Sequence, residues 1–124
     1  HNWIISPSGN TALNYLHFST QVTNSWDYIS SGPNREYKVG KKIIKFHRVA
    51  SKDIQGYNKK TILLIQALKK IGKDNVTHDE ISILINELSI KEKKQAVEEA
   101  KYTSSWIYEI IKKIYKGDSN VRNN

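Results

Sequence analysis

Cysteine is absent from this chain of 124 residues, and so is methionine. Without cysteine there is no disulfide framework and no thiolate ligand for a metal, so a reducing compartment is the expected setting. No apolar run approaches the roughly 20 residues that a membrane-spanning helix requires, and no signal-peptide pattern opens the chain. We therefore expect a cytoplasmic protein without a membrane partner, and a chain of this length usually forms one compact domain.

The lack of methionine, together with His1 at the first position, predicts a fragment. A bacterial reading frame begins with Met, and the processing that removes it normally needs a small second residue, which His is not. We therefore expect a segment to be missing before His1, and any function of that segment lies outside these residues.

Patterns typical of catalysis are also lacking. The sequence contains neither a G-x-S-x-G element nor a phosphate-binding glycine loop. Its four histidines have no metal-ligand spacing; His78 follows a helix cap, and His47 is a possible phosphate contact, but a surface role is the simpler interpretation for both. We therefore predict no enzyme, no cofactor and no metal site. The alternative, an enzyme that acts on nucleotides, is supported only by the basic charge.

Positive charge is concentrated in the middle of the chain. The net charge is +8, and residues 35–60 hold nine basic side chains against Glu36 and Asp53. Residues 1–34 contain no Lys or Arg, and residues 61–124 are close to balanced. This distribution indicates a basic surface that faces an anionic partner, although a lysine-rich surface facing only solvent would look the same.

Regular structure is indicated along most of the chain. We expect a strand or linker at 3–5, a short helix at 10–17, a strand at 26–29, and a hairpin with strands at 37–39 and 43–49 around Gly40. In the second hairpin strand, Ile44 and Phe46 share one face, which we expect to pack. Lys45 and His47 share the other, which we expect to be wet and positive.

The second half is predicted to be helical. Apolar residues recur at helical spacing over 61–71, with Gly72 as a C-terminal cap. Thr77 with Glu80, and Ser89 with Glu92, have the form of capping boxes that open two further helices, and a last helix is expected over 106–115. The fold class is therefore α+β: a small antiparallel sheet with one helix before it and about four helices after it. We expect one domain over 1–117 and a polar, disordered tail over 118–124.

Two surfaces are candidates for binding. The basic hairpin is predicted to contact nucleic-acid phosphates through six side chains: Arg35, Lys38, Lys41, Lys42, Lys45 and Arg48. The alternative is a protein-interaction or oligomerisation module without nucleic-acid contact, with Tyr102, Trp106 and Tyr115 as aromatic anchors. A simple core role for Trp106 competes with that hypothesis, and the sequence leaves the oligomeric state open.

Four stretches carry a resemblance to a known family: SGNTALNYLHFSTQV (8–22), SGPNREYKVGKKIIKFHR (31–48), LLIQALKKIGKDNVT (63–77) and YTSSWIYEIIKKI (102–114). In this order they are similar to the C-terminal region of bacterial AbiEi-type antitoxins of type IV toxin–antitoxin systems. None of the four is a catalytic signature. The chain differs from this family at His17-Phe18, where relatives often have Leu-Gly. We expect this difference to alter the local turn and not the fold.

The resemblance implies a transcriptional regulator. Such proteins typically begin with a winged helix-turn-helix that binds operator DNA, which would be the segment missing here. The region present would be the antitoxin-like half, which opposes a nucleotidyltransferase-like toxin. Type IV antitoxins counteract the effect of the toxin, so a direct contact with the toxin is not required. DNA and a cognate toxin are therefore the expected partners.

Overall fold

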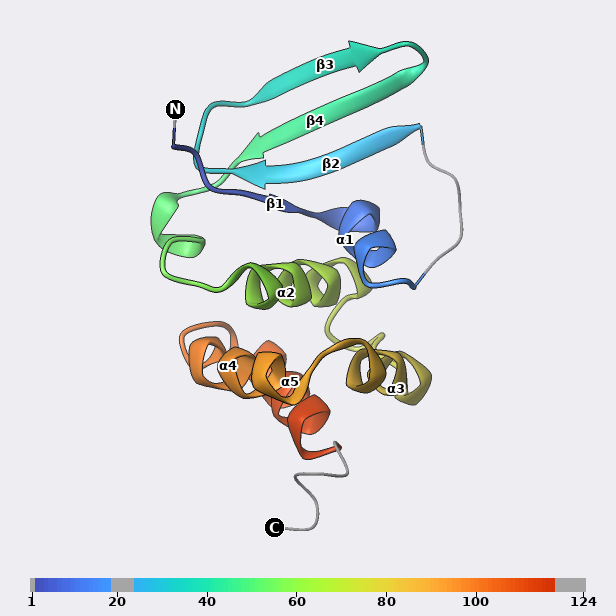
Figure 1. Ribbon diagram of the computed structural model, residues 1–124, viewed down its shortest axis with the longest axis vertical. Coiled ribbons are helices and arrows are strands. Elements are labelled where there is room, and N and C mark those ends of the chain that lie inside the picture. Colours follow the sequence, from blue (N-terminus) through green and yellow to red (C-terminus); the bar gives the residue numbers. More distant parts are fainter. Residues whose placement is uncertain (1, 19–23, 118–124) are drawn as a thin grey trace.

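The computed structural model describes residues 2–18 and 24–117 and has four strands and five α-helices within them (Figure 1). In chain order these are β1 (Ile5–Pro7), α1 (Gly9–Tyr15), β2 (Ser25–Ser30), β3 (Arg35–Val39), β4 (Lys42–Arg48), a 3₁₀ turn (Ser51–Asp53), α2 (Lys59–Ile71), α3 (His78–Glu87), α4 (Ile90–Ala100) and α5 (Ser105–Lys116). This arrangement confirms the predicted α+β class. The tail predicted over 118–124 lies outside the described residues. None of the described helices is long and apolar enough to cross a membrane.

The sheet is mixed rather than antiparallel throughout. Its strand order is β1-β2-β4-β3, and β4 pairs antiparallel with β3 but parallel with β2. The hairpin itself was predicted correctly. The parallel pair was not, because pairing between strands that are not neighbours in the chain leaves no local sequence signal.

The link between β2 and β3 passes the end of β4. It runs over residues 31–34 from one neighbour of β4 to the other. The Asn34 side chain accepts a hydrogen bond from the Arg48 backbone N–H at 2.7 Å, and the Val49 N–H donates to the Ser30 carbonyl at 2.9 Å. These two bonds hold the end of β4 against the link and against the end of β2.

The helices form two tiers below the β1 edge of the sheet. Figure 1 shows α1 and α2 next to the sheet, and α3, α4 and α5 beneath them. The main core lies between these tiers, where Leu64 and Leu68 of α2 meet Ile111 of α5. A smaller core joins Ile29 of β2 to Ile62 of α2. The helix α2 therefore connects the sheet to the lower tier of helices, and α1 packs beside it against the sheet.

Both predicted capping boxes are present. The Glu80 N–H donates to Thr77 Oγ1 at 3.2 Å, and Glu80 Oε1 accepts from the Thr77 N–H at 2.9 Å. Ser89 and Glu92 repeat the pair of bonds at 3.1 and 2.8 Å. Each box satisfies backbone donors that the first turn of a helix otherwise leaves unpaired.

The helix α1 ends on a left-handed residue. His17 has a φ of 61°, its N–H donates to the Asn14 carbonyl, and the Phe18 N–H donates to the Leu13 carbonyl. This is the Schellman pattern, in which glycine usually occupies the left-handed position. The left-handed position is thus His17, whereas the Leu-Gly pair of the resemblance would place glycine at position 18.

Replacement of His17 by glycine is expected to raise the free energy of unfolding by about 1 kcal/mol, because glycine has no Cβ to strain at positive φ. The change also removes the contact between His17 Nδ1 and Glu87 Oε1 at 2.6 Å, but exposed ion pairs contribute only about 0–1 kcal/mol. Urea denaturation measures the difference, and Glu87→Gln, which removes the pair alone, is the control. Both variants lack the pair, so a His17→Gly variant no more stable than Glu87→Gln would show that the left-handed position holds no strain for glycine to relieve.

Candidate functional site

The hairpin β3–β4 extends away from the helices. Figure 1 shows it at the far side of the sheet, with α2 against the opposite edge, and all five residues of β3 are exposed. The loop between the strands is the pair Gly40-Lys41, and Gly40 has a φ of 64°. Positive φ at Gly40 but not at Lys41 is the geometry of a type II′ turn, which suits the twist of a hairpin.

The six predicted basic residues divide between the two faces of the sheet. Cross-strand partners point to the same face, and successive residues alternate. Arg35 is the partner of Phe46, and Lys42 is the partner of Val39. We call the face that they share the aromatic face. Its cations are Arg35, Lys42 and Arg48, and its apolar and aromatic residues are Trp26, Tyr28, Tyr37, Val39, Ile44 and Phe46. Lys38 and Lys45 lie on the opposite face, and Lys41 lies in the turn.

The opposite face is electrically mixed. Lys45 has Glu36 as its partner on β3 and Asp27 as its partner on β2. His47 Nε2 lies 3.8 Å from Asp27 Oδ1. The prediction that the face of Lys45 and His47 is the positive one is therefore wrong, because the register places two carboxylates beside these residues.

Charge on the aromatic face has one sign. Arg35, Lys42 and Arg48 lie there, and among the described residues of β2, β3 and β4 neither acid falls on this face. Lys42 Nζ lies 5.6 Å from the centre of the Trp26 ring, within the range of a cation–π contact. The face that was expected only to pack is therefore the more basic of the two.

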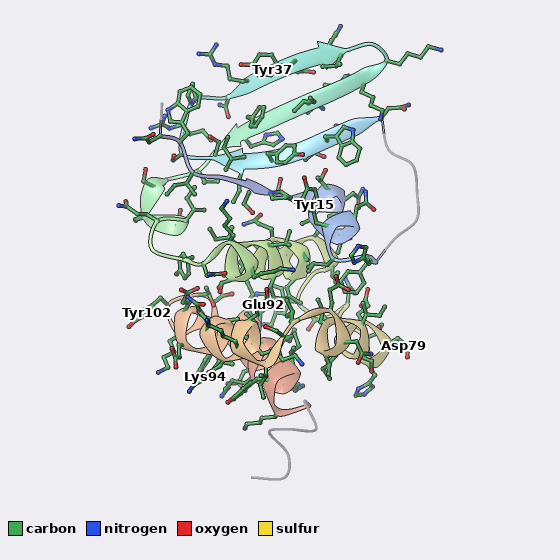
Figure 2. All side chains as sticks on the ribbon, viewed as in Figure 1. Tyr15, Tyr37, Asp79, Glu92, Lys94 and Tyr102 are labelled. Atoms are coloured by element: carbon green, nitrogen blue, oxygen red, sulfur yellow. The ribbon has the colours of Figure 1, made fainter. Side chains whose placement is uncertain are left out.

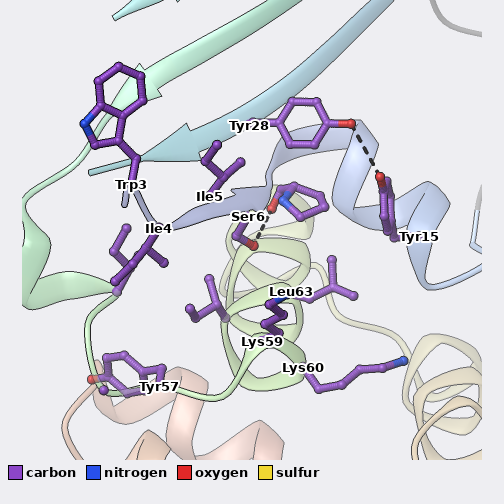
Figure 3. Close-up of a pocket in the computed structure, with 14 residues that line it drawn as sticks. Trp3, Ile4, Ile5, Ser6, Tyr15, Tyr28, Tyr57, Lys59, Lys60 and Leu63 are labelled. Atoms are coloured by element: carbon purple, nitrogen blue, oxygen red, sulfur yellow. Dashed lines mark hydrogen bonds between the residues drawn. The ribbon is translucent and has the colours of Figure 1, made fainter. Parts of the chain in front are cut away.

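A cavity of about 680 Å³ opens where β1 faces α2 (Figure 3). Its walls are mainly apolar and aromatic, with Ile5 and Tyr28 from the sheet and Leu63 from α2. Lys59 and Lys60 contribute cations from the first turn of α2. This composition suits a ligand with an apolar or aromatic body and a negative charge.

Two phenol groups of this cavity, those of Tyr28 and Tyr57, have raised pKa values. Burial, followed by the hydrogen bond with Tyr15, raises the pKa of Tyr28 to about 12. The two hydroxyl oxygens lie 3.4 Å apart, and either can donate (Figure 3). Burial is also the main cause that raises the pKa of Tyr57. The Tyr28 ring lines this cavity and also lies on the aromatic face.

The three aromatic residues predicted to bind protein do not form one patch. Tyr102 is 83% exposed in the turn before α5 (Figure 2). Trp106 packs against the main core as a partly buried side chain. Tyr115 lies nine residues further along, about two and a half helical turns, so it projects from the opposite side of α5. Tyr102 therefore remains the one exposed anchor of the three.

Within residues 2–18 and 24–117, no three His, Asp or Glu side chains lie close enough together to hold a metal ion. The acids of the helices are instead used locally, as in the contact of Glu109 with Lys112 at 2.8 Å, where the hydrogen bond lowers the pKa of the Glu109 carboxyl.

Sequence reasoning missed the aromatic members of the site. The alternation of Trp26 and Tyr28 on one strand, and of Ile44 and Phe46 on another, is visible in the sequence. The register that aligns these pairs is not visible there. The cavity was also missed, since its lysines precede the predicted start of their helix.

A family model matches residues 2–97, a span that includes the whole sheet and the helices α1 to α3. Its description is a family of unknown function, DUF6088. No curated protein matches the chain, and no solved structure does. Because the match covers well over half of the chain, the protein belongs to the DUF6088 family.

Proposed function

We propose that this chain is a non-enzymatic, cytoplasmic module of a bacterial transcriptional regulator that contacts nucleic acid through its β3–β4 hairpin. The observation that supports this proposal is the aromatic face, where Arg35, Lys42 and Arg48 lie together with no carboxylate from the described strands. Cations grouped in this way bind phosphates, and the excess of positive charge in residues 35–60 agrees with such a partner. The antitoxin part of the proposal, with DNA and a nucleotidyltransferase-like toxin as partners, rests on the AbiEi resemblance.

The position of the hairpin supports the same proposal. Its distance from the helices leaves the strands free to approach a backbone or groove, as β-ribbons do in several nucleic-acid-binding proteins (Figure 1). Cations on a rigid strand also lose less freedom on binding than cations on a loop would.

The test is fluorescence anisotropy with labelled duplex and single-stranded oligonucleotides at low and at physiological salt. The variant is the triple reversal Arg35→Glu, Lys42→Glu and Arg48→Glu. Loss of three phosphate contacts is expected to lower the slope of log affinity against log salt by about 2.7 for a duplex or about 2.1 for a single strand.

The control reverses the same amount of charge elsewhere. Lys91, Lys94 and Lys101 are exposed on or next to α4, in the lower helical tier, where Figure 2 labels Lys94. Their reversal to Glu is expected to leave most of the salt slope in place. Equal losses in both triple variants, or no binding by the natural sequence at low salt, would overturn the proposal.

Tyr102 supports a second candidate function, a protein-interaction module. Tyrosine is enriched among the residues that contribute most to protein–protein binding, and this side chain is exposed to solvent. Tyr102 also borders a cavity of about 240 Å³ together with Ile107 and Gln66. Failure of nucleic-acid binding at low salt would favour this candidate over the first.

A further inference from the structure

Aromatic rings form a continuous row across three strands. Tyr28 of β2 stacks on Phe46 of β4 with ring centres 5.4 Å apart and planes 23° apart. Tyr37 of β3 meets the same Phe46 edge-on at 6.0 Å and 84°. Trp26 lies one step along β2 on the same face, beside Ile44. The parallel pairing of β2 with β4 is what brings these rings together.

Most of this row lies away from the helices, although Tyr28 reaches the Tyr15 hydroxyl of α1 and lines the cavity beside α2. Tyr37 is 49% exposed and Val39 is 59% exposed. An open sheet face is usually polar, because exposed apolar area is unfavourable in water. An apolar surface of this kind, with two exposed side chains beside partly buried rings, commonly marks a binding site.

The charge of this face points to the chemistry of the partner. Arg35 and Arg48 lie at one end of the row, toward the start of β3 and the end of β4, and Lys42 lies at the other end. Aromatic rings between cations are suited to a ligand that alternates flat rings with negative charges. Single-stranded nucleic acid has this composition, and its unpaired bases can stack on aromatic side chains.

We infer that the aromatic face is a platform for single-stranded nucleic acid, with Tyr37 as its most accessible stacking residue. This inference rests on the proposed function and names its substrate class. Bases stack on Tyr37 and its neighbours in the row, while the three cations neutralise phosphates along the strand. A duplex cannot use the rings in this way, because its bases are already stacked on each other.

The experiment compares four labelled probes of equal length: oligodeoxythymidine, oligouridine, an abasic deoxyoligonucleotide and a duplex. The abasic probe retains the phosphates and lacks the bases, so it isolates the contribution of stacking. The natural sequence is expected to bind the two single strands more tightly than the abasic probe. Oligouridine and oligodeoxythymidine together show whether RNA or DNA is preferred.

Tyr37→Ala is expected to weaken binding to the intact strands by about 5- to 150-fold, the range for loss of one stacked base. Its affinity for the abasic probe should stay unchanged, which also shows that the hairpin is still folded. Tyr37→Phe keeps the ring and should bind as the natural sequence does. Tyr102→Ala removes an exposed tyrosine that lies away from Tyr37, in the lower helical tier, and is the matched control (Figure 2).

Two negative results can be told apart. Equal, salt-dependent affinity for intact and abasic strands would overturn the platform and leave the phosphate contact of the proposed function standing. No binding to any of the four probes at low salt would overturn both. Loss of abasic binding in Tyr37→Ala would mean that the residue acts through the fold of the hairpin, which also contradicts a stacking role.

Discussion

Replacement of Leu68 by alanine is expected to lower the free energy of unfolding by about 2–5 kcal/mol. Leu68 is fully buried on α2 within the main core. Removing its methyl groups loses their burial and leaves a cavity, and rigid neighbours on both helical tiers can close only part of that cavity. Natural domains are stable by about 5–15 kcal/mol, so this single change removes a large share of the total.

Urea denaturation followed by circular dichroism measures this effect. Ile83→Ala is the control, because Ile83 is a comparable side chain on α3 that is 38% exposed. Its substitution should cost well under half as much. If Leu68→Ala cost no more than Ile83→Ala, α2 would not be the centre of the core that the packing indicates.

Replacement of Gly40 by valine is expected to open the β3–β4 hairpin without unfolding the domain. Gly40 has a φ of 64° and open space around its Cα, so the cost is backbone strain rather than a clash. That strain is about 1–2 kcal/mol for a side chain in the left-handed region. Because β3 pairs with β4 alone, a local opening of the hairpin relieves all of this backbone strain. The equilibrium constant for that opening should therefore rise by roughly 5- to 30-fold.

Amide hydrogen exchange measures this opening residue by residue. Protection should fall in β3 and persist in α2. Gly56→Val is the matched control: Gly56 has a φ of 87° and no close neighbour, but it lies in the loop before α2. Equal loss of protection in β3 in both variants would show that the turn at Gly40 does not set the stability of the hairpin.

Local signals in the sequence predicted most of the elements. The capping boxes at Thr77 and Ser89 and the glycine after Ile71 marked helix ends correctly, because each acts within one helical turn. The hairpin around Gly40 was equally visible, since its turn and strands are adjacent in the chain. These features depend on neighbouring residues alone.

The sites were harder to predict because they depend on register. The six hairpin cations looked like one group, but the partners of Lys45 and Lys42 place these two residues on opposite faces. Lys93 shows the same limit in the helices: its charge suggests solvent, yet its side chain is 2% exposed on α4. Burial of this kind is decided by tertiary packing, which no spacing in the sequence specifies.

The position of β4 has a consequence for the order in which the protein folds. This strand comes last in the sheet and yet lies between two strands that precede it. The strands β2 and β3 therefore do not pair with each other, and the strands cannot join the sheet in the order in which they occur in the sequence. A hairpin closes in about 1–10 μs, faster than contacts between distant segments form, so we expect β3 and β4 to pair before they dock on β2. The Tyr28–Phe46 stack joins β2 to β4, so the rate at which it forms would report that docking step.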